Sequence, residues 1–327
     1  MINYSLGALL TLLVLIDILW TTLWIDGGAG PVSSTVAKLS WVTTRKLSRV
    51  HKKIFGIVGP ITLMLTLMSW VFLLWIGVAL FFSGNPYSIS HQSSEGPAVW
   101  YEFLYFSGYT IFTLGLGDYS PQAGFWQVMT AFVSGVGMLH LTLSASYVIS
   151  IISAIVQKRA LSRTISGIGK TSSDFLQCVW NGEDFHQLDI MLNDMSSTIT
   201  QLNQQNHAFP LLNYYYTDMP EKSSAVTIAV LDEALTLIDF GLKDKRLINT
   251  TIMAAAQSSI GTYLDTVTDE YGYESEELPP IPNITHLKEL DVPIVSEDEF
   301  KEKLKSISKR RRQLLGVVIS EEQEWPN

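Results

Sequence analysis

The sequence predicts an all-α membrane protein with an α-helical cytosolic domain, and three observations carry this prediction. Apolar runs cover residues 4–24, 54–82 and 124–156, and each is near or above the length of about 20 residues that spans a bilayer. Lys and Arg are absent from residues 1–37 and 54–157. Beyond residue 164 the chain holds 26 of its 31 acidic residues and 13 of its 22 basic ones, so its second half is polar and acidic.

The basic residues outside the apolar runs indicate the topology. They cluster at residues 38–53 and 158–163, and positively charged loops stay on the cytoplasmic side of a membrane. We therefore expect a multi-pass protein of the cell membrane, with its N-terminus outside and the second half of the chain in the cytoplasm. Glu102 and Asp118 then face outward, where negative charge raises the local concentration of cations.

The first predicted element, residues 1–27, is an N-terminal transmembrane helix with Asp17 in its middle. A carboxylate inside a bilayer is costly, so it marks either a functional site or a polar contact with Ser or Thr of a neighbouring helix. The structural contact is favoured. Residues 28–53 form a basic amphipathic cytoplasmic linker for which two roles remain open: contact with anionic lipids of the inner leaflet, or a plain connection.

A short apolar and aromatic run, residues 100–112, lies between the second and third long runs. It is too short to span a bilayer, so we expect a re-entrant helix. It leads into Thr113-Leu-Gly-Leu-Gly-Asp118. Gly115 and Gly117 allow left-handed backbone dihedrals, which let successive carbonyl groups face one axis. Rings of carbonyl oxygens replace the water shell of a cation, and Asp118 adds a carboxylate at the outer end.

This segment resembles the Thr-Val-Gly-Tyr-Gly-Asp signature of tetrameric potassium channels, with Leu114 and Leu116 at the Val and Tyr positions. It is most similar to the second pore of two-pore-domain potassium channels. The resemblance covers residues 54–158 and implies a potassium-channel-like pore domain of outer helix, pore helix, filter and inner helix. Four copies are implied as well, because a single filter strand cannot surround an ion. The implied filter consists of Thr113, Leu114, Gly115, Leu116, Gly117 and Asp118, with K⁺ held by the carbonyl groups of the first four.

Apart from K⁺ in the filter, we expect no cofactor, no nucleic-acid partner and no catalytic site. Two alternatives to a K⁺-selective homotetramer remain open. Leu116 lacks the Tyr hydroxyl that braces a filter from behind, which leaves a channel that passes both Na⁺ and K⁺ as the first alternative. A membrane sensor with a vestigial pore is the second.

The last apolar run contains Gly135 and Gly137, each of which costs about 1 kcal/mol relative to Ala inside a helix. Gly137 stands where the potassium-channel family has its gating-hinge glycine, and close helix packing is the alternative for either glycine. His140 lies off the expected pore face and is expected to pack between helices. The resemblance implies that one helical face lines the cavity and narrows to an inner gate: Met138, Leu141, Thr142, Ala145, Ile149 and Ile152.

Residues 159–270 are predicted to form a helical cytosolic domain, with helices at 175–202, 223–240 and 245–267. It contains no Gly-rich nucleotide-binding turn and no EF-hand loop, so any cytosolic ligand or ion is unidentified. The absence of an intramembrane arginine series excludes voltage sensing of the usual kind and leaves the gating stimulus open.

Residues 271–327 are predicted to be an acidic, Pro-rich linker followed by a basic C-terminal helix at 297–315. Three roles remain open for the basic block Lys309–Arg312: contact with inner-leaflet lipid, contact with the acidic linker, or a solvated helix face.

Overall fold

The computed structural model describes residues 1–48, 56–92 and 96–326, which form two compact units. The first unit comprises mainly Met1–Lys46, Val58–Ile152 and Ala208–Tyr214. The second comprises mainly Ser153–His207 and the chain from Tyr215 onward. One helix, α5 (Phe125–Ile168), contributes residues to both.

Within the described residues, three helices are long and apolar enough to span a membrane. They are α1 (Ile2–Leu23), α3 (Val58–Ser83) and α5, in agreement with the three predicted runs. Helix α5 is longer than its apolar run and ends at Ile168, because Leu161 and Ile165 are buried in the core of the second unit.

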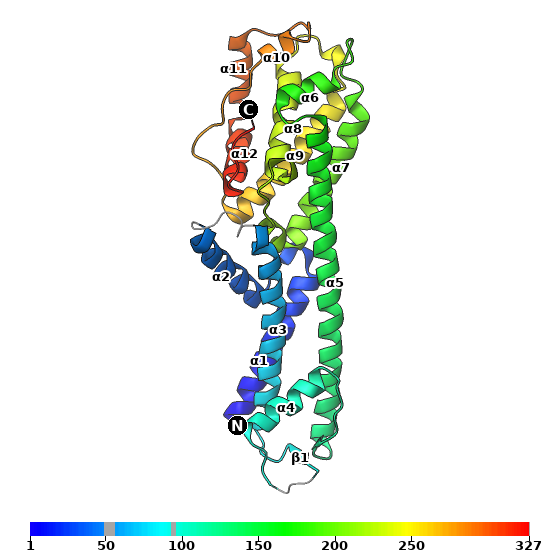
Figure 1. Cartoon of the computed structure of the whole chain (residues 1–327), viewed down its shortest axis with the longest axis vertical. Helices are drawn as coiled ribbons and strands as arrows, with labels where there is room; N and C mark the ends of the chain where they lie inside the picture. The colour runs from blue at the N-terminus through cyan, green and yellow to red at the C-terminus, as the bar shows by residue number, and fades with distance from the viewer. Residues whose placement is uncertain (49–55, 93–95, 327) are drawn as a thin grey trace. The chain divides into compact units, whose positions relative to one another are not determined.

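Helices α1 and α3 pack along one another in the first unit (Figure 1). Small residues permit this close contact. A Cβ atom added at Gly7 would lie 2.3 Å from the backbone nitrogen of Phe81, and one at Gly77 would lie 2.7 Å from Thr11 Oγ1. The other elements of this unit are η1 (Ile25–Gly27), α2 (Pro31–Ser48), β1 (Ile89–His91), α4 (Trp100–Ile111), β2 (Tyr119–Pro121) and η3 (Pro210–Tyr214).

Asp17 is fully buried and joins three helices. One carboxylate oxygen, Oδ1, accepts the backbone N–H of Val32 at 2.7 Å, in the first turn of α2. The other, Oδ2, accepts Ser33 Oγ at 2.6 Å and Trp70 Nε1 of α3 at 2.7 Å. A negative charge is favourable at a helix N-terminus, so Asp17 stabilises the start of α2. The structural role, with a serine partner, is therefore confirmed.

Helix α2 is also attached to α3 by a hydrogen bond between Ser40 Oγ and Thr62 Oγ1 at 2.7 Å. The lipid contact predicted for the linker at residues 28–53 stays a prediction. Its basic residues Arg49, Lys52 and Lys53 lie outside the described residues.

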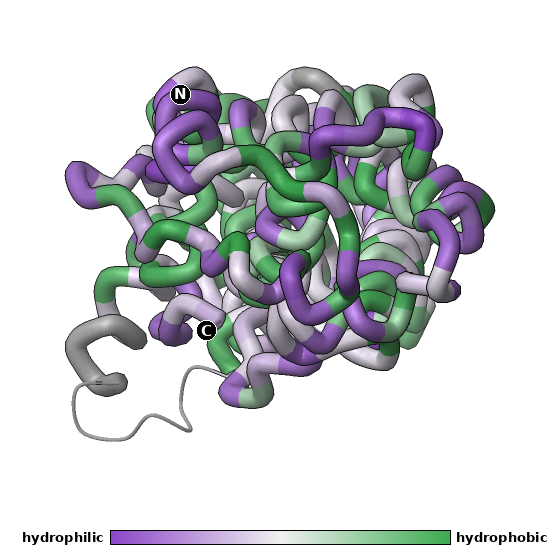
Figure 2. The backbone as a smooth tube through the Cα atoms, turned by 90° about the horizontal axis from the view of Figure 1, so that it is seen from above, coloured by the Kyte–Doolittle hydropathy of each residue, from purple (hydrophilic) through white to green (hydrophobic). Residues whose placement is uncertain are grey.

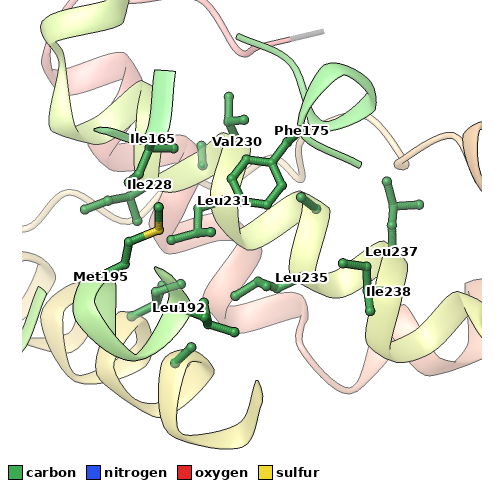
Figure 3. Packing of buried hydrophobic residues seen from close by; sticks show 14 of the residues in the cluster. Ile165, Phe175, Leu192, Met195, Ile228, Val230, Leu231, Leu235, Leu237 and Ile238 are labelled. Atoms are coloured by element: carbon green, nitrogen blue, oxygen red, sulfur yellow. The ribbon is translucent and has the colours of Figure 1, made fainter. Parts of the chain in front are cut away.

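The second unit is built around α8 (Ser224–Gly241), nearly all of whose side chains are buried. Ser223 Oγ accepts the N–H of Val226 and fixes where this helix begins. Figure 3 shows Phe175, Leu192 and Met195 around Leu231 in the core. The surrounding helices are α6 (Ser172–Val179), α7 (Leu188–Ala208), α9 (Thr250–Tyr271), α10 (Thr285–Lys288), α11 (Glu297–Lys305) and α12 (Ser308–Ser320), with the short turns η4 (Pro220–Lys222) and η5 (Lys245–Leu247).

Hydrophilic and hydrophobic residues alternate at short intervals along the backbone, which is typical of amphipathic elements (Figure 2).

The helix predicted at residues 175–202 is wrong in its continuity. The chain leaves α6 at Trp180 and turns before α7 begins at Leu188. Asn181 Oδ1 accepts the N–H groups of Glu183 and Asp184, both at 2.7 Å, and Gly182 has φ 94. This Asn-Gly turn overrides the helical periodicity on either side of it.

The extended linker predicted within residues 271–327 is also wrong. Ile284, Leu287, Val292 and Val295 belong to the core of the second unit, because the apolar residues between the acids and prolines suffice to anchor the segment. An isolated antiparallel bridge joins Leu242 to Ile294. The helix predicted at 297–315 is divided at residues 306–307 into α11 and α12, and α12 continues to Ser320.

The basic block Lys309–Arg312 contacts acidic residues of its own unit. The predicted contact with the acidic linker is met by Arg312, which pairs with Glu274, whereas the acidic partners of the other three residues lie in α8 and α9, outside that linker. Burial raises the pKa of Glu233 to about 7, and the nearby Arg311 opposes this rise. The pairs are Lys309–Asp265 (3.3 Å), Arg310–Asp232 (3.3 Å), Arg311–Glu233 (3.9 Å) and Arg312–Glu274 (3.4 Å).

We predict that Asp17→Ala lowers the free energy of unfolding by at least about 3 kcal/mol, because it leaves several buried donors without an acceptor. Thermal unfolding of the purified protein in detergent measures this change. Ser34→Ala is the matched control, since the hydrogen bond from the Ser34 hydroxyl to Pro31 O is exposed. Equal melting temperatures for the two variants would contradict the role of Asp17.

Candidate ion pore

Helix α4 (Trp100–Ile111) ends one residue before the bound predicted for the re-entrant helix, and side chains hold it at its start and near its middle. At its start, Glu102 Oε2 accepts the N–H of Val99 at 2.8 Å. Further along, Trp75 Nε1 of α3 donates to Leu104 O at 2.7 Å. Twelve helical residues measure about 18 Å, which is too short to cross a bilayer, so a re-entrant placement of α4 stays a prediction that its length fits.

The backbone after α4 alternates in handedness. Thr113, Gly115 and Gly117 have φ values of 55, 59 and 81, whereas Leu114 and Leu116 keep negative φ. Alternation between right- and left-handed wells turns neighbouring peptide groups to the same side, which ordinary strand geometry does not do. Both glycines have the positive φ that was expected of them.

Thr113 was not predicted to take a left-handed dihedral. A β-branched residue with positive φ is a genuine outlier, and such residues persist only where the surrounding structure imposes them. Two hydrogen bonds to α4 do so here: Thr113 N–H donates to Thr110 O at 3.2 Å, and Leu114 N–H donates to Tyr109 O at 2.8 Å.

Side chains of α4 and β2 brace the outer end of this strand. Tyr109 Oη donates to Tyr119 O. Tyr119 Oη in turn donates to Glu102 Oε1 at 2.7 Å, the same carboxylate that holds the start of α4. Burial and the bond to Glu102 raise the pKa of Tyr119 to about 12, so its hydroxyl keeps the proton that it donates. These tyrosines supply support that Leu116 lacks, and spacing alone did not reveal them.

A small hairpin covers the same end. Strands β1 and β2 are antiparallel and pair His91 with Tyr119 and Ser90 with Ser120. Beyond β1, the N–H of Gln92 donates to Asp118 O at 3.1 Å, and its side-chain Nε2 donates to Gly117 O at 2.7 Å. The Asp118 carboxylate accepts the N–H of Tyr119 at 3.1 Å.

The six residues predicted to line a cavity share one exposed face of α5. Met138 and Ile149 are the most exposed, at 61% and 69%. The opposite face, with Val133, His140 and Tyr147, is buried. The other four, Leu141, Thr142, Ala145 and Ile152, are exposed as well, as the helical spacing predicted.

Residues 61–154, which contain α4, the alternating strand and most of this face, match the family model described as an ion channel. The chain belongs to the ion-channel family. The membrane protein YdjJ of Bacillus subtilis (strain 168) is 39% identical over 320 residues, which cover 98% of this chain and 94% of YdjJ. The two are thus members of one family over nearly their whole lengths. No solved structure matches the chain.

Two glycines in the channel's α5 have different surroundings. A Cβ atom added at Gly137 would lie 2.1 Å from Ile111 O, at the end of α4 and two residues before Thr113. Gly135 has open space around it. The structure therefore assigns close packing to Gly137, and a hinge role stays a prediction that fits Gly135 better. His140 packs on Trp70, with ring centroids 6.2 Å apart, as the prediction of interhelical packing stated.

A segment distant in the sequence packs within the channel's first unit, and sequence reasoning assigned it no role. Phe209 contacts Tyr147 of α5, and Tyr214 contacts Trp41 of α2, with ring centroids 5.8 Å apart in each pair. The η3 turn between them packs on α3. The chain that follows α7 is thus in contact with three helices of this unit.

The far end of α5 is held in the second unit by buried polar groups. Lys158 Nζ lies 3.4 Å from Glu321 Oε1, and both side chains are less than a tenth exposed. Ser223 Oγ donates to the other oxygen of Glu321. Gln205 Nε2 of α7 donates to Gln157 Oε1 at 2.6 Å. Within the described ranges, no cluster of three His, Cys, Asp or Glu residues could hold a metal ion.

We predict that Gly137→Ala lowers the free energy of unfolding by about 1 to 3 kcal/mol, since its methyl group meets Ile111 O and overpacks the contact. Gly135→Ala is the matched variant, and its higher helix propensity raises stability by up to about 1 kcal/mol. Thermal unfolding in detergent distinguishes the two. A destabilised Gly135→Ala beside an unaffected Gly137→Ala would refute the packing assignment.

Proposed function

We propose that the chain forms a K⁺-selective channel through which K⁺ moves passively, with four copies around one pore. The alternating backbone of residues 113–117, in a chain of the ion-channel family, is the observation that carries this proposal. One such strand presents carbonyl groups to an ion from one side only, and closed symmetry of four copies completes the ring. The coordinating groups are the carbonyls of Thr113, Leu114, Gly115 and Leu116.

Selectivity for K⁺ over Na⁺ requires that the carbonyl rings coordinate K⁺ better than the smaller ion. Either the size of the ring or the field strength of its carbonyl dipoles can supply this preference. The bonds from Tyr109 to Tyr119 and from Tyr119 to Glu102 support such rigidity, because they hold the outer end of the strand to α4. A pore that also passes Na⁺ is the outcome expected if Leu116 leaves the strand too soft.

The exposed face of α5 is proposed to line the aqueous cavity, with Ile149 and Ile152 as an apolar inner gate that closes by dewetting. In this arrangement the filter faces outward and the basic loops face the cytoplasm of the cell. Anionic lipids of the inner leaflet are proposed to meet the basic linker at residues 28–53.

Gating is proposed to pass from the second unit to the pore through α5. Lys158 follows Ile152 by six positions on one continuous helix, so a displacement of Lys158 moves the gate residues with it. The ion pair with Glu321 attaches this point to the end of α12. A cytosolic ligand or ion that shifts α12 would then change the open probability.

Reversal potentials test the conduction proposal. In liposomes with K⁺ on one side and Na⁺ on the other, the wild-type channel is expected to give a potential close to the K⁺ equilibrium value. Gly115→Ala is expected to abolish K⁺ flux while four copies remain assembled, since a Cβ atom disfavours the left-handed dihedral at this position. Unchanged K⁺ selectivity in Gly115→Ala would refute the filter, and no flux from the wild type would favour the vestigial pore.

A charge swap tests the coupling. Lys158→Glu is expected to cost about 3–5 kcal/mol of stability and to alter open probability, because it leaves Glu321 buried beside a like charge. The double variant Lys158→Glu with Glu321→Lys should restore both. The exposed pair Lys170–Glu221 serves as control, and Lys170→Glu should leave the melting temperature nearly unchanged.

Single-channel recordings report the open probability, and thermal unfolding reports the stability. A double variant that is stable again but gates like Lys158→Glu would contradict a gating role for the pair.

A further inference from the structure

The Gly117 carbonyl is bound by a side chain from the outer hairpin, and this sets it apart from the carbonyls before it. Gln92 Nε2 donates to Gly117 O at 2.7 Å, and the N–H of Gln92 donates to Asp118 O at 3.1 Å. One residue thus holds two successive carbonyl groups at the outer end of the strand. Neither residue of this contact was predicted from the sequence to interact with the other.

The hairpin that carries Gln92 is anchored independently of its side chain. Ser88 Oγ is buried and donates to Phe82 O, near the end of α3, at 2.8 Å. Gln122 N–H donates to Ser88 O at 2.9 Å, and the pairs of β1 and β2 complete the ladder. The position of Gln92 is therefore determined by backbone hydrogen bonds, and the fold does not require its amide.

Gly117 itself resists reorientation poorly. It has φ 81, and no atom lies within 4 Å of the place where its Cβ would be. Without a Cβ atom, glycine tolerates a wide range of both φ and ψ, so the peptide after Gly117 can rotate unless its carbonyl is held. The neutral amide of Gln92 supplies the donor that holds it, without adding a charge beside the ion path.

We propose that Gln92 is a positioning residue for ion selectivity. By holding the Gly117 carbonyl away from the pore axis, it ends the row of coordinating carbonyls at Leu116 and keeps the number of ion sites constant. The inference rests on the proposed filter and deepens it, because it names a residue outside residues 113–118 that determines how rigid the filter is.

The test compares Gln92→Leu and Gln92→Glu with Ser90→Ala in full-length protein in liposomes. Ser90 lies on the same strand, and its hydroxyl contacts Ser120 O rather than the filter. Gln92→Leu is expected to lower the K⁺ to Na⁺ permeability ratio by about threefold to tenfold, the effect of losing one hydrogen bond. Ser90→Ala should keep the wild-type ratio, and mass measurement should find four copies in every variant.

Gln92→Glu adds a readout that a purely structural role would not change. The carboxylate cannot donate a hydrogen bond at pH 7.5, so the ratio should fall as in Gln92→Leu. A Glu side chain ordinarily protonates near a pKa of about 4.3, and the protonated form can donate to Gly117 O. Selectivity of this variant should therefore recover between pH 7.5 and pH 4.5, relative to the wild type at each pH.

A wild-type ratio in Gln92→Leu, or no recovery of Gln92→Glu in acid, would overturn the proposal. If the wild-type protein shows no preference for K⁺, that result contradicts the proposed K⁺-selective function but does not by itself contradict the role of Gln92. In that case the total cation flux of Gln92→Leu against Ser90→Ala decides the role of Gln92: a changed flux supports it, and an unchanged flux overturns it.

Discussion

The non-helical strand of residues 113–117, between α4 and α5, is the element on which the first unit depends. Within a membrane, protein must hold such a strand on every side that does not face an aqueous path, because no water is there to satisfy its polar groups. In this chain the support comes from several distant places in the sequence. Trp75 holds α4, Ile111 rests on Gly137, and Gln92 reaches the strand from the outer hairpin. Residues 113–117 themselves remain exposed.

A second constraint, the burial of charge, organises the other unit. Asp232 and Glu233 lie inside α8, and burial raises the pKa of both carboxyl groups. Arg310 and Arg311 of α12 approach them and offset part of that cost. Removing one partner of such a pair leaves an uncompensated buried charge, which is far more costly than replacing both. The pairing of the two arginines of α12 with the two acids of α8 therefore also determines how α12 is oriented on α8.

The parts of this molecule that were predictable from the sequence are those governed by short-range rules. Apolar length located α1, α3 and α5, and the spacing of Gly115 and Gly117 indicated the backbone that both residues adopt. Asp17 was correctly expected to find a serine partner. The unpredicted parts depend on contacts between distant residues. Nothing local to Gln92, Tyr119 or Phe209 shows what it touches.

Two errors arose where a local signal was outweighed or missed. The acids and prolines of residues 271–299 suggested an extended linker, yet four apolar residues among them suffice to hold the segment on the core. The Asn181-Gly182 turn was hidden by helical periodicity on both sides. The ion-binding, hinge and cavity-lining roles stay predictions, because they depend on a ring of subunits.

The burial of α8 has a consequence for the order in which the molecule matures. During synthesis the three long apolar helices and residues 113–118 leave the ribosome long before α12, whose Val317 and Val318 complete the core around α8. Until then the acids of α8 and the end of α5 at Lys158 lack their partners. The residues of the first unit up to Ile152 are therefore all synthesised before the second unit has closed around α8. A nascent or prematurely terminated chain would carry an α5 that lacks the contact between Lys158 and Glu321, although its packing on Trp70 and Ile111 is already possible.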